Sequence, residues 1–421
     1  MEFEKGEEAG WHVILGTNGS GKSSVIRSFA LMMMGEREAY ASRQDFNRWI
    51  GYNKNSARIS GTISADFDFD GFSKQGAVPK RPITPEVVIE RSELSYARAA
   101  DLSFKGEGTP RTIWGTGDGW FSASFGPFRR FTGGDRIYDR LFVSNKRLAP
   151  HLTALGEDVA LTEALSWLSS LFVKSLQDEK SNTPSTAGDI LNGVLTFIND
   201  SKFLPHDAKI EFISDDAVLI LDGNGNLVSI DQLSDGYRSA LSLTLEILRQ
   251  MFELFGHAKV FRALELNSRQ IMLPGVVAID EVDAHLHPTW QRDIGRWLTR
   301  CFPNIQFIVT THSPIVCRAV ANDDGVITGG VWKLPAPGSD DLARRIEGTE
   351  LEQLIFGDVL DAYGTELFGE GVTRSPVGGR MVERLAELNL RAIDHGLTEE
   401  EKREQAHLRA TFPAEAGRLK A

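Results

Sequence analysis

A run of glycines near the start of the chain ends in a lysine and two serines, which are residue types that bind phosphate. Residues 16–24 read GTNGSGKSS and match the spacing G-x-x-x-x-G-K-[ST] in full. Glycines let backbone N–H groups turn inward around phosphate oxygens. In this pattern Lys22 reaches the β- and γ-phosphates of a nucleotide, and Ser23 coordinates Mg²⁺. We expect phosphate contacts from Gly16, Thr17, Asn18, Gly19, Ser20, Gly21, Lys22, Ser23 and Ser24.

Two acids follow a long apolar run in the second half of the chain. The run GVVAI, at residues 275–279, leads directly to Asp280 and Glu281. At the end of a strand, the Asp280 carboxylate can hold a metal ion directly or through water. The Glu281 carboxylate can orient or deprotonate a water molecule that attacks a phosphate. The alternative is two surface acids that merely end a strand, and the phosphate-binding loop upstream disfavours it.

A third group, His312, follows the apolar run FIVTT. Parallel strands present their carboxyl ends to the ligand crevice, so His312 could hydrogen-bond a γ-phosphate. A structural histidine whose ring is satisfied locally is the alternative. His285 and His287 have the spacing of a metal pair, but no third ligand accompanies them, so zinc is not expected.

A second helix start suited to an anion lies far downstream of the first. The stretch LSDGYRSALSLTLEIL begins at Leu233 with serine, aspartate and glycine and continues as an apolar-periodic helix. The Ser234 hydroxyl, the Gly236 backbone N–H and the helix N-terminus could together hold a phosphate. An ordinary helix N-cap by Ser234 or Asp235 explains the same residues. We call Leu233–Arg238 the signature.

Composition and charge place the chain among ordinary globular proteins. Of its 421 residues 41% are hydrophobic and 25% are charged, and its net charge is −12. This acidic balance argues against indiscriminate coating of nucleic acid. No apolar run is long enough for a membrane span and the start, MEFEKGEEAG, lacks a secretory pattern, so we expect a cytoplasmic protein without a membrane partner. Six basic residues form a local strip in the sequence, and we interpret them as part of an ordinary solvated surface: Arg129, Arg130, Arg136, Arg140, Lys146 and Arg147.

Apolar patterns predict the elements that hold these groups in place. Trp11–Leu15 is typical of a buried strand, and an apolar-periodic helix follows the phosphate-binding loop and ends at Gly35. The apolar runs before Asp280 and His312 are continuous, and an amphipathic helix separates them. Such strands indicate a mostly parallel sheet flanked by helices, so the predicted fold class is α/β.

Between the loop and the signature the pattern changes. Period-two alternation from Ile59 to Phe69 recurs at 87–89 and 121–125, which indicates an antiparallel β lobe. Helical spacing follows, and then three short strands with the turn DGNGN between the last two. The predicted organisation is a head at 1–339, with a β lobe at about 56–130, a helical insertion at about 150–205 and the signature hairpin and helix at about 208–256, followed by a helical C-terminal region at 340–421.

The order of these motifs resembles that of ABC-type ATPase heads, a class of P-loop NTPase, and above all their soluble SMC, RecF and OLD branch. The phosphate-binding loop, the signature, the acids 280–281, the stretch DAHLHP and His312 follow one another as in that family. The stretches LSDGYRSAL, DEVDAHLHPTWQ and FIVTTHSP are similar to those of stand-alone ATPases in bacterial anti-phage modules such as Septu. The resemblance covers roughly residues 10–335.

This resemblance implies an ATP hydrolase that uses Mg²⁺, with Lys22, Glu281 and His312 in catalysis and Ser23 and Asp280 on the metal ion. In the family two heads pair head to tail, and the signature of one head faces the nucleotide of the other. The resemblance therefore implies that the signature residues Ser234, Asp235 and Gly236 act in a dimer or a higher oligomer.

Two further positions follow from the resemblance alone. Asp283 corresponds to the aspartate that crosses the dimer interface. The glutamine-loop residue is either Gln44 or lies in the stretch FGPFRRF at 125–131. The expected partners are a second copy of the chain and a DNA-linked protein such as a nuclease, in anti-phage defence or DNA repair, with DNA itself as a further candidate.

Three other functions stay open at this point. The chain could be the ATPase subunit of a membrane transporter, although the long insertion before the signature argues against it. It could be a nucleotide-gated scaffold with little turnover. It could also be a self-contained nuclease of the OLD type, but the residues after Pro335 show no strand-borne cluster of acids.

Overall fold

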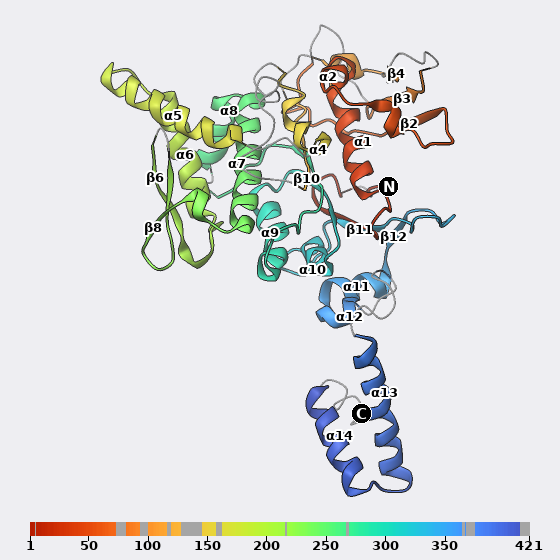
Figure 1. Ribbon diagram of the computed structural model, residues 1–421. Helices are drawn as coiled ribbons and strands as arrows, with labels where there is room; N and C mark the ends of the chain where they lie inside the picture. The colour runs from red at the N-terminus through yellow and green to blue at the C-terminus, as the bar shows by residue number, and fades with distance from the viewer. Residues whose placement is uncertain are drawn as a thin grey trace. The chain divides into compact units, whose positions relative to one another are not determined.

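The computed structural model describes residues 1–4, 6–72, 81–92, 100–115, 119–127, 145–156, 162–214, 217–266, 269–363, 367 and 375–412. The chain divides into two compact units, Met1–Phe356 and Gly357–Ala421 (Figure 1). The first unit holds all the motifs named above. The boundary that we expect between residues 339 and 340 stays a prediction.

A six-stranded sheet forms the centre of the first unit, in the order β12-β11-β1-β10-β9-β5. The five strands from β11 to β5 are parallel to one another, and the edge strand β12 is antiparallel to β11. This arrangement confirms the predicted α/β class with a mostly parallel sheet. The strands are β1 (Gly10–Leu15), β5 (Ser122–Phe125), β9 (Gly275–Ile279), β10 (Ile305–Thr311), β11 (Gly330–Lys333) and β12 (Arg344–Ile346).

Helices cover both faces of this sheet. On one face, α1 (Lys22–Met34) packs its Ile26 against Ile14 of β1, Ala278 and Ile308. On the other, α9 (Pro288–Cys301) lies so close to β1 that a Cβ at Gly295 would stand 2.7 Å from the Trp11 ring. The predicted strand Trp11–Leu15 and the helix that ends before Gly35 are confirmed. The shorter helices of this unit are α2 (Glu36–Ala41), α4 (Leu152–Leu155), α8 (His257–Leu266), α10 (Pro314–Cys317) and α11 (Gly348–Phe356).

The β lobe is a three-stranded antiparallel sheet of β2 (Ser56–Ser60), β3 (Glu86–Glu90) and β4 (Asp101–Lys105). Its inner face joins a core that includes Leu31 and Met34 of α1. Two expectations for this region are wrong. The alternation that begins at Ile59 is a strand only as far as Ser60, with a single bridge at Ile63 beyond it.

The strand at residues 121–125 does not belong to the β lobe, contrary to the prediction. It is β5, and it pairs in parallel with β9 of the central sheet. Its apolar side chains are buried there, whereas the alternation of residue types was interpreted as a half-exposed strand.

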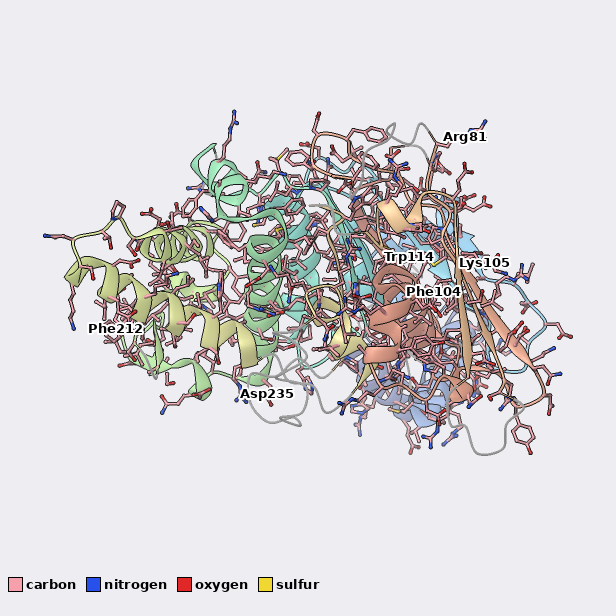
Figure 2. The ribbon with its side chains drawn as sticks, turned by 90° about the horizontal axis from the view of Figure 1, so that it is seen from above. Arg81, Phe104, Lys105, Trp114, Phe212 and Asp235 are labelled. Carbon is pink, nitrogen blue, oxygen red and sulfur yellow. The ribbon has the colours of Figure 1, made fainter. Side chains whose placement is uncertain are left out.

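A second lobe precedes the signature and lies on the opposite side of the central sheet from the β lobe (Figure 2). Two helices, α5 (Thr162–Lys180) and α6 (Thr186–Asp200), pack on each other and lead into a small antiparallel sheet. That sheet contains β6 (Lys209–Ile213), β7 (Val218–Leu221) and β8 (Leu227–Ser229), as the three predicted strands require. The long helix α7 (Asp235–Phe255) follows directly, so the hairpin delivers the chain to the signature.

The second unit contains α12 (Val359–Tyr363), α13 (Pro376–Asp394) and α14 (Glu399–Thr411). Leu385, Leu388 and Leu408 form the core between α13 and α14. A capping box begins α14, because the Thr398 hydroxyl accepts from Glu401 N and the Glu401 carboxylate accepts from Thr398 N. Among the helices that the structure describes in either unit, none has the length and apolar character that a membrane span requires.

Candidate nucleotide site

The phosphate-binding loop leaves β1 after Leu15 and runs into the first turn of α1. Gly19 and Gly21 have φ angles of 80° and 94°, in the left-handed region that favours glycine. A Cβ at Gly16 would lie 2.3 Å from the Ser20 hydroxyl oxygen, so a side chain at Gly16 would displace Ser20. The glycine spacing is therefore required by the backbone of the loop itself.

Lys22 is folded back over this loop. Its Nζ donates to the carbonyl oxygens of Gly16 and Thr17 at 2.7 and 3.0 Å, and the residue is 6% exposed. Burial lowers the pKa of the Lys22 ammonium, while the carboxylates of Glu281, Asp280 and Asp283 act in the opposite direction. The same interactions show that the loop and the three acids belong to one electrostatic site.

The residues present fit a phosphate group. The Ser20 hydroxyl is buried and has no hydrogen-bond partner within the described part of the chain, which leaves a donor inside the loop. Space lies beside Gly21, where a Cβ would meet nothing within 4 Å. Ser23 is half-buried in the first turn of α1 and Ser24 is exposed. A buried lysine, an unpartnered hydroxyl and a helix N-terminus are together suited to a bound anion.

The two acids after β9 are held from both sides. The Asp280 backbone N–H donates to Phe125 O of β5 at 2.8 Å, and the Asp280 carboxylate accepts from the Thr310 hydroxyl at 2.6 Å. That hydroxyl also accepts from the Glu281 backbone N–H at 2.7 Å. Asp280 is 4% exposed, whereas Glu281 is half-buried and has a left-handed φ of 45°.

Asp283 is fixed by the other threonine at the end of β10. The Thr311 hydroxyl donates to the Asp283 carboxylate at 2.5 Å and accepts from the Ser313 backbone N–H at 2.9 Å. The Ser313 hydroxyl in turn donates to Gln291 of α9 at 2.8 Å. His312, between these two hydroxyl residues, is exposed.

The register of the sheet explains why these groups meet. Leu15 of β1 lies opposite Thr311 of β10, and Val309 of β10 lies opposite Ile279 of β9. Three adjacent parallel strands therefore end at one edge, and the loop, the acids and His312 all follow those ends. Thr310 and Thr311 were not predicted as site residues. The signal that could have found them is the pair of hydroxyl residues at the end of the apolar run FIV, directly before His312.

The signature is the start of α7. Ser234 is the N-cap residue and is exposed, yet its side chain makes no capping hydrogen bond. Asp235 instead forms an ion pair with Arg238. Gly236 is required at its position, because a Cβ there would stand 2.7 Å from the His285 carbonyl oxygen. The signature therefore rests on the turn that follows Asp283, and none of its hydrogen bonds among the described residues reaches the phosphate-binding loop of the same chain.

The two candidates for the glutamine loop lie in different places. Gly126 directly follows β5, whose Phe125 carbonyl accepts from Asp280, so the stretch 125–131 begins at the edge of the sheet that carries the acids. Its residues from Phe128 onward lie outside the described part of the chain. Gln44 follows α2 and is half-buried. The choice between them stays a prediction.

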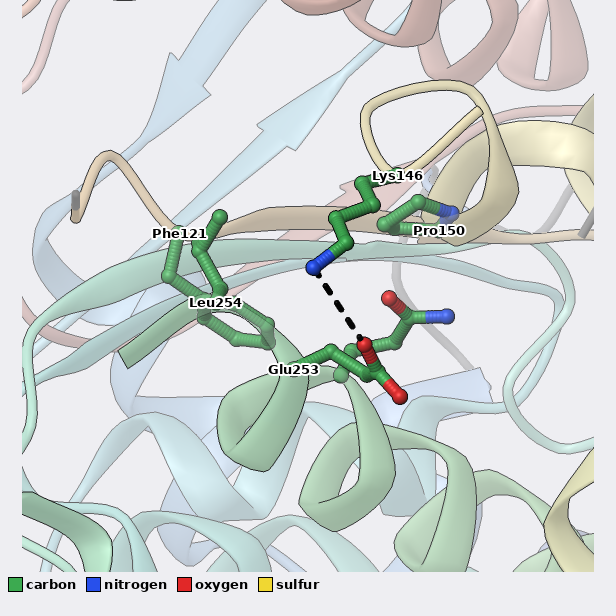
Figure 3. A pocket seen from close by; sticks show the side chains of 6 residues that line it. Phe121, Lys146, Pro150, Glu253 and Leu254 are labelled. Atoms are coloured by element: carbon green, nitrogen blue, oxygen red, sulfur yellow. Dashed lines mark ion pairs between the residues drawn. The ribbon is translucent and has the colours of Figure 1, made fainter. Parts of the chain in front are cut away.

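Two basic residues of the predicted strip, Lys146 and Arg147, lie within the described residues. Lys146 lies 3.8 Å from Glu253 of α7, beside a small hollow (Figure 3), and burial lowers the pKa of the Arg147 guanidinium. The other four, Arg129, Arg130, Arg136 and Arg140, lie outside the described residues. The hollow is lined by Phe121, Lys146, Pro150, Gln250, Glu253 and Leu254.

His285 and His287 have different local surroundings. Within the described part of the chain no group of three histidine, cysteine or acidic side chains is placed to hold a metal ion by itself. His287 is the N-cap residue of α9, where its ring accepts from the Thr289 backbone N–H. His285 has a left-handed φ of 65° in the turn that contacts Gly236.

Comparison with known proteins agrees with these motifs. Residues 131–318 match the family model described as AAA domain, putative AbiEii toxin, Type IV TA system. The Retron Ec83 probable ATPase of Escherichia coli is 37% identical over 136 residues, which are 32% of this chain and 23% of that protein. The Septu protein PtuA of Bacillus mycoides (strain KBAB4) is 24% identical over 343 residues, which are 76% of this chain and 37% of that protein.

The chain spans much less than the full length of these relatives. Among solved structures, an SMC head bound to the C-winged helix domain of ScpA aligns with 80% of this chain and 90% of that one, at 14% identity and a TM-score of 0.43. The ordered motifs, the sheet that carries them and the sequence relatives support the resemblance to P-loop ATPases of the soluble SMC, RecF and OLD branch.

Proposed function

We propose that this chain binds and hydrolyses ATP with Mg²⁺, in a head-to-tail dimer that controls a DNA-linked partner in anti-phage defence. The observation that carries the first part is the convergence of the phosphate-binding loop, Asp280 and Glu281 at one edge of the sheet, where the Lys22 ammonium interacts with both acids. A cation and two carboxylates beside an anion-binding loop are what phosphoryl transfer needs.

Each residue has a role in this site. Lys22 leaves its contacts with the loop carbonyls and binds the terminal phosphates, while the glycine backbone and Ser20 hold the other oxygens. Ser23 and Asp280 hold Mg²⁺, which supplies positive charge against the phosphates. Glu281 accepts a proton from the attacking water, and His312 donates to the γ-phosphate. Asp280 is buried, whereas Glu281 is half-buried and can reach water.

The second part of the proposal is that each site needs two heads. Ser234 is exposed, and its side chain makes no capping hydrogen bond at the start of α7. Its hydroxyl is therefore available to a nucleotide bound by another copy. Gly236 keeps the backbone close to the turn after Asp283, so both segments belong to one surface. We assign this surface to the partner head, with Asp283 facing across it.

The third part concerns the biological role. The relatives are named as probable ATPases of retrons and as the Septu protein PtuA, and these names support an ATPase that works in defence against phage. We assign the cutting of nucleic acid to a partner such as a nuclease. We also propose that the chain is cytoplasmic.

Phosphate release from MgATP tests the activity. The unaltered chain should release phosphate with Mg²⁺ and not with EDTA, and Lys22→Ala should abolish release. Binding of MgATP without release would identify a nucleotide-gated scaffold instead. Co-purification of the chain with membranes, rather than with a nuclease from its own operon, would favour a transporter subunit.

A further inference from the structure

Two consecutive threonines end β10, and each one binds a different acid. Thr310 and Thr311 are both fully buried, although their hydroxyls lie at the edge of a sheet whose interior is apolar. Neither residue belongs to the phosphate-binding loop, the acidic pair or the signature. Because successive side chains of a strand point to opposite faces, the two hydroxyls lie on opposite faces of the sheet.

Thr310 holds three consecutive residues of the segment after β9. Its hydroxyl donates to Asp280 at 2.6 Å and accepts from Glu281 N at 2.7 Å, and its carbonyl oxygen accepts from Val282 N at 3.0 Å. A hydroxyl has one hydrogen to donate, so this pattern fixes the direction of both bonds. The donated hydrogen orients the Asp280 carboxylate, and the accepted one holds Glu281 at its left-handed φ.

Thr311 serves the next acid along the chain. Its hydroxyl donates to Asp283 at 2.5 Å and accepts from Ser313 N at 2.9 Å, which ties Asp283 to the start of α10. Asp283 lies two residues before His285, whose carbonyl oxygen touches the signature at Gly236. The Thr311 bond therefore reaches the surface that we assign to the partner head.

We propose that Thr310 and Thr311 are positioning residues with divided roles. Thr310 orients Asp280 and Glu281 for metal binding and hydrolysis within its own head, and Thr311 orients Asp283 for contact with the second head. This inference rests on the proposed function, because the roles of the acids come from it. It predicts that removing one hydroxyl harms chemistry and that removing its neighbour harms pairing.

Paired substitutions isolate each hydroxyl. Thr310→Val keeps the shape and removes the hydroxyl, while Thr310→Ser keeps the hydroxyl and removes only a methyl group. Thr310→Ala against Thr310→Ser gives a second comparison of the same kind if the valine variant does not fold. Thr311→Val and Thr311→Ser form the matched set at the neighbouring position.

Three readouts separate the two roles. Thr310→Val should lower kcat by about 10–100-fold, with a KM for ATP within about twofold, since a bond to a charged group and the turn at Glu281 are lost. It should also raise the Mg²⁺ concentration needed for half-maximal binding of a fluorescent ATP analogue. In the nucleotide-free chain, the Glu281 amide should exchange faster with solvent in Thr310→Val than in Thr310→Ser.

Thr311→Val should leave those three quantities within about threefold of the unaltered chain when the head is saturated with its partner. It should instead raise the protein concentration at which ATPase activity per head is half-maximal by about tenfold, while Thr311→Ser stays near the unaltered value.

The opposite results overturn the inference. If Thr310→Val and Thr310→Ser lose kcat equally, the residue acts through packing of its methyl group. If the two valine variants show the same pattern, the roles are not divided. These outcomes presuppose an unaltered chain that hydrolyses MgATP, so they leave the proposed function intact. An unaltered chain that binds no nucleotide would overturn both the proposed function and this inference.

Discussion

The two helix starts that could hold an anion differ in almost every local property. At the start of α1, Lys22 is buried and bonded to the loop, and two glycines have left-handed backbones. At the start of α7, Ser234 and Asp235 are exposed, and the serine side chain caps nothing. Helix dipoles alone do not distinguish them, because both helices are long enough to favour an anion at the N-terminus.

The difference lies in what surrounds each start. Around α1 the same chain supplies a cation and three acids, so the site is nearly complete in cis. Around α7 it supplies a glycine contact to the turn after Asp283 and an ion pair that uses Asp235 locally. A loop with its own cation and acids, together with a helix start whose Ser234 is exposed and makes no capping hydrogen bond, is what a composite site between two copies requires.

Lys22→Ala should have the largest effect, because it removes a buried cation that is bonded to the loop. We expect ATP turnover to fall by at least about 10³-fold and MgATP affinity to weaken, since a charge-assisted contact in a buried site is lost. Phosphate release and nucleotide titration measure the two effects. Lys105→Ala, at an exposed position of the β lobe, is the matched control and should change neither. Normal affinity and turnover in Lys22→Ala would refute the loop assignment.

Glu281→Gln should separate binding from chemistry. The amide keeps the shape of the side chain and cannot accept the proton, so turnover should fall about 10²–10⁴-fold while MgATP still binds. Single-turnover hydrolysis measures the loss. Glu211→Gln, at an exposed position of β6, should behave as the unaltered chain. If Glu281→Gln hydrolyses ATP at a near-normal rate, another residue is the base.

Mixing two inactive chains should restore part of the activity. A Ser234→Arg head keeps a sound phosphate-binding loop, and a Lys22→Ala head keeps a sound signature. Random pairing of equal amounts makes about half of the dimers mixed, and each mixed dimer has one complete site, so roughly a quarter of all sites in the mixture are complete. ATPase activity should therefore rise toward about that fraction on mixing, provided that one occupied site suffices for pairing. No gain at any mixing ratio would argue that the two helix starts do not share a site.

The smallest effect concerns the strand beneath α1. His12 of β1 is fully buried, and burial lowers its pKa to about 4. In the unfolded chain His12 binds a proton near pH 6.5, whereas in the folded chain it binds one only near pH 4. The free energy of unfolding therefore falls as the pH decreases from about 6.5 to about 4. The loss is about 1.4 kcal/mol per pH unit, and His12→Phe should remove that part of the slope in denaturant titrations. An unchanged slope in His12→Phe would show that His12 does not carry this part of the pH dependence.

The sequence predicts those parts of the site in which residue type and spacing are dictated by chemistry. The loop at residues 16–24, the acids after β9 and the strand before His312 could be recognised because each pattern is local. The position of β5 could not be, because Ser122–Phe125 joins the central sheet through pairing with β9, far along the chain. Thr310 and Thr311 were missed for the same reason, since their importance depends on acids that lie on a neighbouring strand.

The most direct test of the composite site is sedimentation of Glu281→Gln with MgATP, with and without Ser234→Arg. Glu281→Gln traps bound ATP, and Ser234→Arg places a bulky cation where the signature must approach the phosphate of the other head. The two changes lie on different segments, so nucleotide binding to one head should survive both. We expect Glu281→Gln to sediment as a dimer with MgATP and the double variant as a monomer. Two monomers, or two equally stable dimers, would show that the signature is a helix start without a role between heads.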